Sequence, residues 1–247
     1  MRYSLEQPKA YLEANVDGTF HAMEAARRHA VDHLLMASTS SVYGGSEEMP
    51  FAETAKADMR LTIYAATKKA IEAMGHAYAH LWGVPTTMFR FFTVYGPWTP
   101  RHGYIQVRRC DLDGRPIDLY NGGDLYRDFT YVGDSVEGIR LLIDAVPVRP
   151  GSAEKIEPSD SLSHVALFRV VNIGNSDKAR LLDFVSAIEA ATGLKAERNM
   201  MPMQKGDVVA TWANADLLFR LTGYHPRTDV RKGVAKFVDW YRNYYDK

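Results

Sequence analysis

HLLMAS (residues 33–38), ATKKAIEAMGHAYAHLW (66–82) and PTTMFRFF (85–92) are the stretches that decide the fold. The first and third are short apolar runs typical of buried strands, and the second has the apolar spacing of a helix that ends at Gly83. A strand, a helix and another strand in this order favour parallel strands joined by a helical crossover. The sequence therefore predicts an α/β fold with a parallel sheet.

The same alternation continues on both sides of this unit. Residues 9–29 carry apolar side chains at helical spacing, including Leu12, Phe20 and Met23, and predict a helix with one buried face. Between the later elements, residues 147–163 contain three prolines and predict a surface loop. Further helices are predicted over residues 134–146, 181–191 and 230–241, and a further strand over residues 168–173.

The composition argues against nucleic-acid and membrane partners. The 247 residues include 30 basic and 30 acidic side chains, so the formal net charge is zero and offers no electrostatic footprint for nucleic acid or an acidic membrane surface. The single cysteine, Cys110, excludes an internal disulfide and is expected to be a packing residue in a reducing compartment. No apolar run has the length of a bilayer span or a signal peptide. We expect a soluble, cytoplasmic protein.

Tyr64 and Lys68 form the candidate catalytic pair. Their spacing places both side chains on one face of the predicted helix. A phenol has an ordinary pKa of about 10, and it can carry a proton near neutral pH only if that pKa is lowered. A neighbouring ammonium group favours the phenolate. The same spacing occurs by chance on many helices, so the interpretation depends on the hydroxyl cluster upstream, Ser38 to Ser41.

That cluster has two interpretations. Hydroxyl groups at the end of a strand can hydrogen-bond a substrate oxygen and orient it. They can also satisfy backbone groups where the strand ends. For Ser38 both interpretations stay open.

His76 and His80 lie one helical turn apart, a spacing that occurs in zinc sites. The sequence offers no third ligand beside them and no glutamate between them, as a zinc protease requires. Exposed helix polarity explains these histidines better, and no metal is expected.

Seven segments match motifs of one enzyme family, in order and over essentially the whole chain. They are RYSLE (residues 2–6), ASTSSVYG (37–44), YAATKKA (64–70), RFFTVYGPW (90–98), RDFTYV (127–132), NIGNS (172–176) and GDV (206–208). By these motifs the chain resembles the extended short-chain dehydrogenases/reductases, and within them the UDP-glucuronate 4-epimerases. The resemblance implies a Rossmann-like domain that binds NAD and a smaller domain that binds a nucleotide sugar.

The resemblance assigns roles to the hydroxyl and lysine residues. It makes Tyr64 the general acid/base, Lys68 the partner that lowers the pKa of Tyr64, and Thr39 a third hydroxyl donor. It also places Tyr64, Lys68, Ser38 and Phe92 in contact with NAD. Independently of the family, a phenolate favoured by an ammonium group and a cationic nicotinamide ring suits removal of the proton from a sugar hydroxyl.

The resemblance also implies nucleotide-binding residues. Arg127 corresponds to the pyrophosphate-binding arginine, although a surface ion pair with Asp128 is an alternative. Asp207 corresponds to the acid that accepts a hydrogen bond from the nucleoside ribose. Arg2 would lie near the sugar, and Arg101 would replace a family arginine from a shifted position.

Ser40, Ser41 and Thr93 are candidates for holding the sugar carboxylate. Relatives that dehydrate sugars carry an acidic pair beside the catalytic hydroxyl, whereas this chain has Ser40 and Ser41 there. The resemblance therefore favours epimerisation over dehydration. Neutral donors could also hold the carboxylate of a 4-keto sugar in an orientation that suppresses loss of carbon dioxide.

One expected element is missing near the N-terminus: the glycine-rich turn that binds the NAD pyrophosphate. We expect a fragment of a longer protein or a truncated relative, with low stability and weak NAD binding. The predicted fold is thus a partial Rossmann-like parallel sheet lacking its first βα units, with a smaller C-terminal α/β substrate domain. Residues 1–97 and 129–176 are assigned to the NAD domain, and residues 98–128 and 177–247 to the substrate domain.

The predicted reaction is NAD-dependent epimerisation of a nucleotide sugar at carbon 4, from UDP-glucuronate to UDP-galacturonate through a 4-keto intermediate. One alternative is another UDP-hexose, and Thr93 discriminates because relatives that act on uncharged sugars often have asparagine there. A second alternative is a non-catalytic remnant that binds a nucleotide sugar or a partner. The resemblance further implies a homodimer, packed through helices 9–29 and 66–82.

Overall fold

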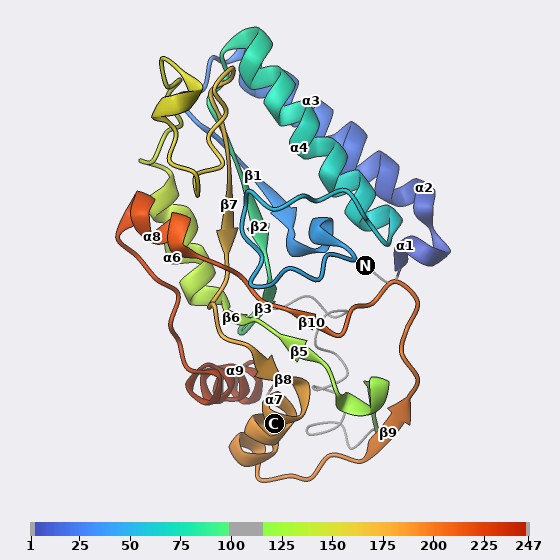
Figure 1. Cartoon of the computed structure of the whole chain (residues 1–247). Coiled ribbons are helices and arrows are strands. Elements are labelled where there is room, and N and C mark those ends of the chain that lie inside the picture. Colours follow the sequence, from blue (N-terminus) through green and yellow to red (C-terminus); the bar gives the residue numbers. More distant parts are fainter. Residues whose placement is uncertain (1–2, 99–115, 246–247) are drawn as a thin grey trace.

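A three-stranded parallel sheet forms the centre of the molecule (Figure 1). The computed structural model describes residues 3–98 and 116–245. Strands β1 (Leu34–Thr39), β2 (Thr86–Phe91) and β7 (Phe168–Ile173) lie in the order β1-β2-β7 and pair along their whole lengths. On its other side β1 pairs with no strand of the described ranges. The predicted parallel α/β architecture is confirmed.

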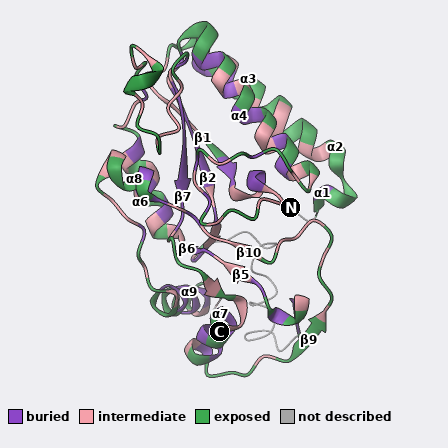
Figure 2. Cartoon of the chain, in the orientation of Figure 1, coloured by how far each residue is buried: buried purple, intermediate pink, exposed green. Residues whose placement is uncertain are grey.

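Helices cover both faces of this sheet (Figure 1). Helix α4 (Ile63–Trp82) packs on one face, with α3 (Gly18–Arg28) beside it, and α6 (Val132–Leu142) and α8 (Asp216–Thr222) pack on the other. Successive residues of β2 point to opposite faces, so Met88 packs under α4 while Phe89 packs under α6 and α8. Burial is densest in β2 and β7 (Figure 2), whereas most of β1 is only half-buried. Helix α8 thus packs on the sheet, although its residues fall in the segment assigned to the substrate domain.

The predicted N-terminal helix is confirmed, but its buried face is not the predicted one. Helix α1 (Tyr3–Glu6) comes first, and α2 (Pro8–Tyr11), the π-helix η1 (Leu12–Asp17) and α3 then follow without a break. Met23 is fully buried, whereas Leu12 is 51% and Phe20 43% exposed. The π-helical turns change the angle between successive side chains, so the uniform helical period assumed from the sequence does not hold there.

Local signals fix both ends of α4, the helix that carries Tyr64 and Lys68. The Thr62 side chain accepts a hydrogen bond from the backbone N–H of Ala65 at 3.1 Å, which caps the N-terminus. At the C-terminus Gly83 adopts a left-handed conformation with φ of 66°. Tyr64 therefore lies in the first turn, close to the carboxyl end of β1.

Smaller sheets and two helices build the rest of the molecule. Strand β3 (Thr93–Tyr95) pairs with β6 (Phe129–Tyr131), β4 (Ile117–Tyr120) with β9 (Arg198–Met201), and β5 (Tyr126–Arg127) lies between β8 (Ala179–Arg180) and β10 (Ala210–Thr211). Helices α7 (Leu181–Thr192) and α9 (Val230–Tyr245) pack together over a core that contains Phe129, Phe184 and Val234. The first two strand pairs and the β5–β10 pair are parallel, and each joins segments far apart in the chain.

The predicted loop between α6 and β7 holds one short 3-10 turn, η4 (Ala153–Lys155). Two histidines of α4 form hydrogen bonds with this loop. His76 Nε2 lies 2.9 Å from Ser163 Oγ, and His80 Nδ1 lies 2.8 Å from the carbonyl oxygen of Val165. Among the described residues, no helix is both long and apolar enough to cross a bilayer.

Candidate active site

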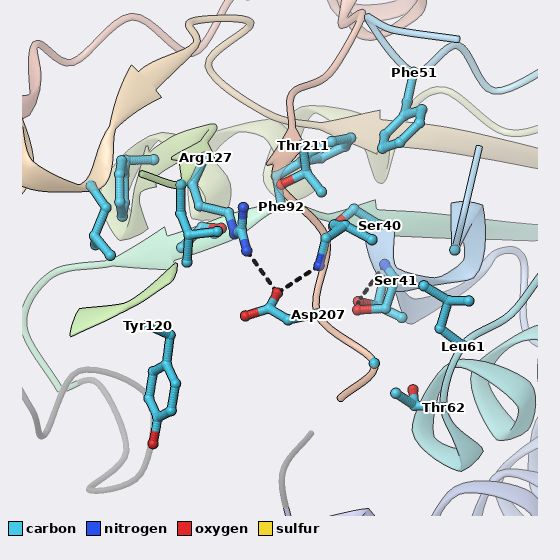
Figure 3. Close-up of a pocket in the computed structure, with 18 of the residues that line it drawn as sticks. Ser40, Ser41, Phe51, Leu61, Thr62, Phe92, Tyr120, Arg127, Asp207 and Thr211 are labelled. Carbon is cyan, nitrogen blue, oxygen red and sulfur yellow. Dashed lines mark hydrogen bonds and ion pairs between the residues drawn. The ribbon is translucent and has the colours of Figure 1, made fainter. Parts of the chain in front are cut away.

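A cavity of about 450 Å³ opens at the carboxyl ends of β1 and β2 (Figure 3). The 3-10 helix η2 (Ser40–Tyr43) follows β1 directly and brings Ser40 and Ser41 to the cavity wall. Much of the remaining wall comes from β3, β4, β5, β10 and residues 206–208. Ligands of α/β proteins usually bind at this edge of a parallel sheet. Of the predicted site residues, the cavity is lined by Thr39, Ser40, Ser41, Phe92, Thr93, Arg127 and Asp207.

Tyr64 lies next to Thr39, which lines this cavity and whose hydroxyl interacts with the phenol. Tyr64 is not itself part of the cavity wall, and its ring packs edge-on against Tyr11, with centroids 5.8 Å apart. Lys68 Nζ donates to the carbonyl oxygen of Ala37 at 3.0 Å, close to the end of β1. The predicted triad of Thr39, Tyr64 and Lys68 is therefore gathered at one end of the central sheet.

The pKa shifts of Tyr64 and Lys68 differ from the prediction. Burial raises the pKa of Tyr64, and the hydrogen bond with Thr39 opposes this rise. Burial also lowers the pKa of the Lys68 ammonium group. Desolvation disfavours a charge on either side chain, which outweighs the predicted lowering of the Tyr64 pKa by Lys68. In this structure the hydroxyl of Thr39, rather than Lys68, favours the Tyr64 phenolate.

In the hydroxyl cluster, one residue satisfies a backbone group and also lines the cavity. Thr39 accepts a hydrogen bond from the Ser41 backbone N–H at 3.2 Å and thereby caps η2, while it also lines the cavity. Ser38 behaves differently. Its hydroxyl is buried and donates to Glu72 Oε1 at 2.6 Å. The predicted contact of Ser38 with NAD is therefore not supported, because its hydroxyl already has an internal partner and does not face the cavity.

Arg127 and Asp207 form an ion pair on the cavity wall (Figure 3). Arg127 Nη2 donates to Asp207 Oδ1 at 2.7 Å, and both side chains are more than four-fifths buried, with exposed fractions of 15% and 18%. The alternative ion pair of Arg127 with Asp128 is wrong. Asp128 is fully buried and accepts hydrogen bonds from backbone N–H groups, including that of Ala213 at 3.1 Å.

Several wall residues were not found from the sequence. Strand β4 contributes Asp118 and Tyr120, β10 contributes Thr211, and the helix cap Thr62 also lines the cavity. None of them belongs to a recognisable motif, and β4 becomes part of the wall only by pairing with β9. The predicted residues Arg2 and Arg101 lie outside the described residues.

A glycine is required at position 206, where the cavity wall lies against the start of α4. Gly206 has a φ of 78°, and a Cβ atom there would lie 2.8 Å from Thr62 Cγ2. A side chain at this position would force Thr62, the cap of the Tyr64 helix, to move. The residue that precedes Asp207 is thus in close contact with the helix that carries Tyr64.

A buried acid, Glu53, contacts β7 of the central sheet. Its side chain is 7% exposed, and its Oε1 accepts a hydrogen bond from the Asn172 backbone N–H at 2.8 Å. Burial raises the pKa of Glu53 to about 7, although this hydrogen bond and the charge of Arg90 oppose the rise. Glu53 is therefore a carboxyl group whose charge changes near neutral pH.

Replacing Glu53 with glutamine should make stability less dependent on pH. The folded-state pKa of about 7 exceeds the ordinary 4.5, so the contribution of Glu53 to stability is complete below 4.5 and is lost as the pH rises through about 7. Glutamine keeps an acceptor for Asn172 and does not ionise. The free energy of unfolding of Glu53→Gln, compared with that of the wild type, should therefore be about 2 kcal/mol more favourable at about pH 8 than at about pH 5.

Chemical denaturation at both pH values measures this change. The exposed Glu157→Gln variant is the control and should show no such gain. An equal difference between Glu53→Gln and the wild type at both pH values would contradict the assignment.

Sequence comparison finds a matching family model and named relatives of this chain. Residues 1–152 match the model of the "NAD dependent epimerase/dehydratase family". A "Probable UDP-glucuronate 4-epimerase" of Rhizobium meliloti (strain 1021) is 49% identical over 246 residues, which are 99% of this chain and 72% of the relative. "Protein CapI" of Staphylococcus aureus is 44% identical over 248 residues, which are 100% of this chain and 74% of the relative.

Solved structures agree with this. MoeE5 in complex with UDP-glucuronic acid and NAD superposes with a TM-score of 0.83 at 31% identity, over 98% of this chain and 75% of that one. The UDP-glucuronic acid 4-epimerase from Bacillus cereus, in complex with UDP-glucuronic acid and NAD, gives a TM-score of 0.80 at 26% identity, over 95% and 69% of the two chains. Together with the family match, these similarities show that the chain belongs to the NAD dependent epimerase/dehydratase family.

Proposed function

We propose that this chain carries out the NAD-dependent epimerisation of UDP-glucuronate at carbon 4, giving UDP-galacturonate. The observation that carries the proposal is the cluster of Thr39, Tyr64 and Lys68 at the end of β1, beside a cavity that contains the Arg127–Asp207 pair. The similarity to relatives named for UDP-glucuronate supports the choice of sugar.

The donor groups at the end of β1 fit the nicotinamide–ribose end of NAD. The hydroxyl of Tyr64 and the ammonium group of Lys68 project from consecutive turns of α4, and both can hydrogen-bond ribose hydroxyls. Phe92, which directly follows β2 and lines the cavity, offers an apolar wall for the ring. When bound, NAD accepts the hydride from carbon 4 and later returns it.

Tyr64 is the proton carrier of this proposal. It accepts the proton of the carbon-4 hydroxyl while that carbon is oxidised, and it returns the proton after the keto sugar has rotated. Thr39 donates to the same oxygen and holds it beside the phenol. Because burial raises the pKa of Tyr64, positive charge beside the phenol is needed before it can act as a base.

Neutral side chains surround the place of the sugar. Ser40, Ser41 and Thr93 line the cavity and can hydrogen-bond a carboxylate without a full positive charge. We assign them to the carboxylate of the keto sugar, which loses carbon dioxide most readily when its carbon–carbon bond is aligned with the ketone. Their orientation would prevent that alignment.

The direct test is to incubate the chain with NAD and UDP-glucuronate and to follow UDP-galacturonate by chromatography. Appearance of this product supports the proposal. If another UDP-hexose is converted instead, the sugar assignment is wrong and the Thr93 argument with it. If neither is converted, although NAD and UDP-glucuronate both bind, the catalytic assignment fails.

Arg127 is assigned to the diphosphate and Asp207 to the nucleoside ribose. The Arg127→Lys variant should raise KM about tenfold with little change in kcat, because lysine loses the forked hydrogen bonds but not the charge. Steady-state kinetics measure KM and kcat separately. Arg140→Lys is the control, because Arg140 pairs with Glu137 on the outer surface of α6 and should leave both constants unchanged. A fall in kcat at constant KM would place Arg127 in the chemistry rather than in binding.

A homodimer is the proposed assembly. Leu12 and Phe20 on the N-terminal helix and Leu81 and Trp82 on α4 are 43% to 64% exposed, although large apolar side chains favour burial. Helices α3 and α4 lie side by side (Figure 1). Light scattering on the purified chain tests the state. The division into two domains and a cytoplasmic location stay predictions.

A further inference from the structure

One rung of the central sheet is polar although it is buried. Ser38 of β1 lies opposite Arg90 of β2, which lies opposite Asn172 of β7. The three side chains are 3%, 2% and 0% exposed. Parallel strands covered on both faces are normally apolar along their whole length, and buried charges are costly unless they are paired. This rung lies beside the carboxyl ends of the strands, where the cavity begins.

Glu72 of α4 binds two members of this rung. Its Oε1 accepts hydrogen bonds from Ser38 Oγ at 2.6 Å and from Arg90 Nε at 2.8 Å, and its Oε2 accepts from Arg90 Nη2 at 2.8 Å. Lys69 Nζ adds a contact to Oε2 at 3.0 Å. Burial alone would raise the pKa of Glu72, but the hydrogen bonds and charge of Arg90 lower it to about 2. The carboxylate is therefore charged and holds a forked guanidinium and a strand hydroxyl together.

The same network continues to η2. The guanidinium of Arg90 lies over the ring of Tyr43, 4.7 Å from its centroid. Tyr43 in turn donates to Asn172 Oδ1 at 2.8 Å. The network thus links α4, all three strands of the sheet and the 3-10 helix that begins with Ser40.

Glu72 shares its helix with the proposed catalytic residues. It lies one turn beyond Lys68 and two turns beyond Tyr64, so all three belong to the same side of α4. Its partner Ser38 directly precedes Thr39. A second link, from Lys68 to the carbonyl oxygen of Ala37, runs parallel to the first. Sliding α4 by one residue would move it about 1.5 Å along its axis and break both links.

We propose that Glu72 and Ser38 are positioning residues, which hold the phenol of Tyr64 in register with the hydroxyl of Thr39. The inference rests on the proposed function for its catalytic meaning, but the geometry that it concerns is present in the free chain. Neither residue touches the cavity. Their effect on the reaction is therefore transmitted by the placement of α4 on β1.

The Ser38→Ala variant is the sharpest test. It removes one hydrogen bond to Glu72 and keeps the forked Glu72–Arg90 pair, so the chain should still fold. With tyrosine labelled by ¹³C at Cζ, the Tyr64 resonance is assigned by its disappearance in Tyr64→Phe. In Ser38→Ala this resonance should shift or broaden, because the hydrogen bond with Thr39 is no longer held at one geometry. Ser38→Thr keeps the hydroxyl and should restore the wild-type resonance.

A matched control comes from a second buried carboxylate. Glu189 of α7 is 5% exposed and pairs with Lys195 and Arg198, each at 3.0 Å. Glu189→Gln should lower stability without moving the Tyr64 resonance, because α7 does not carry the proposed catalytic residues. An unchanged Tyr64 resonance in Ser38→Ala, with stability lowered as in Glu189→Gln, would overturn the proposal and leave Ser38 a purely structural residue.

Kinetics supply the second readout. Ser38→Ala should lower kcat about tenfold with KM unchanged, since misplacement of a catalytic group acts on the chemical step. A rise in KM at constant kcat would overturn the proposal. If the wild type shows no epimerase activity but the Tyr64 resonance responds to Ser38→Ala and is restored in Ser38→Thr, the positioning role stands and the proposed function fails.

Discussion

Tyr64→Phe is expected to lower kcat by about a thousandfold while changing KM little, because a positioned acid/base contributes two to four orders of magnitude. Phenylalanine keeps the ring that packs against Tyr11 but removes the hydroxyl that bonds to Thr39. The loss should therefore appear in chemistry and not in folding. Steady-state kinetics with UDP-glucuronate, together with a thermal unfolding curve, separate the two effects.

Tyr78→Phe provides the control on the same helix. Its hydroxyl donates to Glu24 at 2.8 Å, on the side of α4 that faces α3, and has no contact with the cavity. The variant should keep wild-type kcat. Activity of Tyr64→Phe at the level of Tyr78→Phe would remove Tyr64 from the mechanism.

The pH dependence of the wild type is a second check. A base with a raised pKa is more ionised at higher pH, so wild-type kcat should increase with pH.

Asp128→Asn should lower the free energy of unfolding by about 4 kcal/mol. Asp128 is fully buried, and each carboxylate oxygen accepts two hydrogen bonds. Oδ1 accepts from Thr130 and from the backbone N–H of Asn175, and Oδ2 accepts from the backbone N–H groups of Ser176 and Ala213. An asparagine amide placed with its NH2 group at the position of Oδ1 could donate to the Thr130 hydroxyl but would point an N–H group at the backbone N–H of Asn175, and the opposite orientation would face the N–H groups of Ser176 and Ala213. At least one buried backbone donor therefore loses its acceptor.

Urea unfolding compares this variant with Asp124→Asn. Asp124 is exposed, with a side-chain exposed fraction of 58%, and its nearest cation is 3.4 Å away on Arg180. The same chemical change there should alter stability by less than about 0.5 kcal/mol. Equal losses in the two variants would mean that Asp128 does not hold the strand ends together.

The fold of the central unit could be predicted because its signals are local. Apolar runs gave β1, β2 and β7 within about two residues of their ends, and the apolar spacing and Gly83 marked α4. The exposed side of the N-terminal helix could not be predicted, since π-helical turns change the side-chain period without a sequence signature. Leu12, which lies in the π-helix, is therefore exposed where burial was expected. Phe20 is exposed as well, although it lies in the regular helix α3.

Some residues of the candidate site could be predicted from the sequence, whereas the contacts between them could not. Thr39, Arg127 and Asp207 were recognised by family resemblance, and all three line the cavity. That Arg127 pairs with Asp207 could not be predicted, because the two lie 80 positions apart and meet only through β5 and β10. The partner of Ser38 was missed for the same reason, since Glu72 belongs to another element.

The parallel pairs β4–β9 and β5–β10 have a consequence for the order in which the molecule assembles. Each joins segments across most of the C-terminal half, and such distant pairings form late because loop closure must come first. The sheet of β1 and β2 can collapse around α4 while the polypeptide is still growing from the ribosome. The cavity proposed for the nucleotide, by contrast, lacks part of its wall until residues 206–211 have been synthesised.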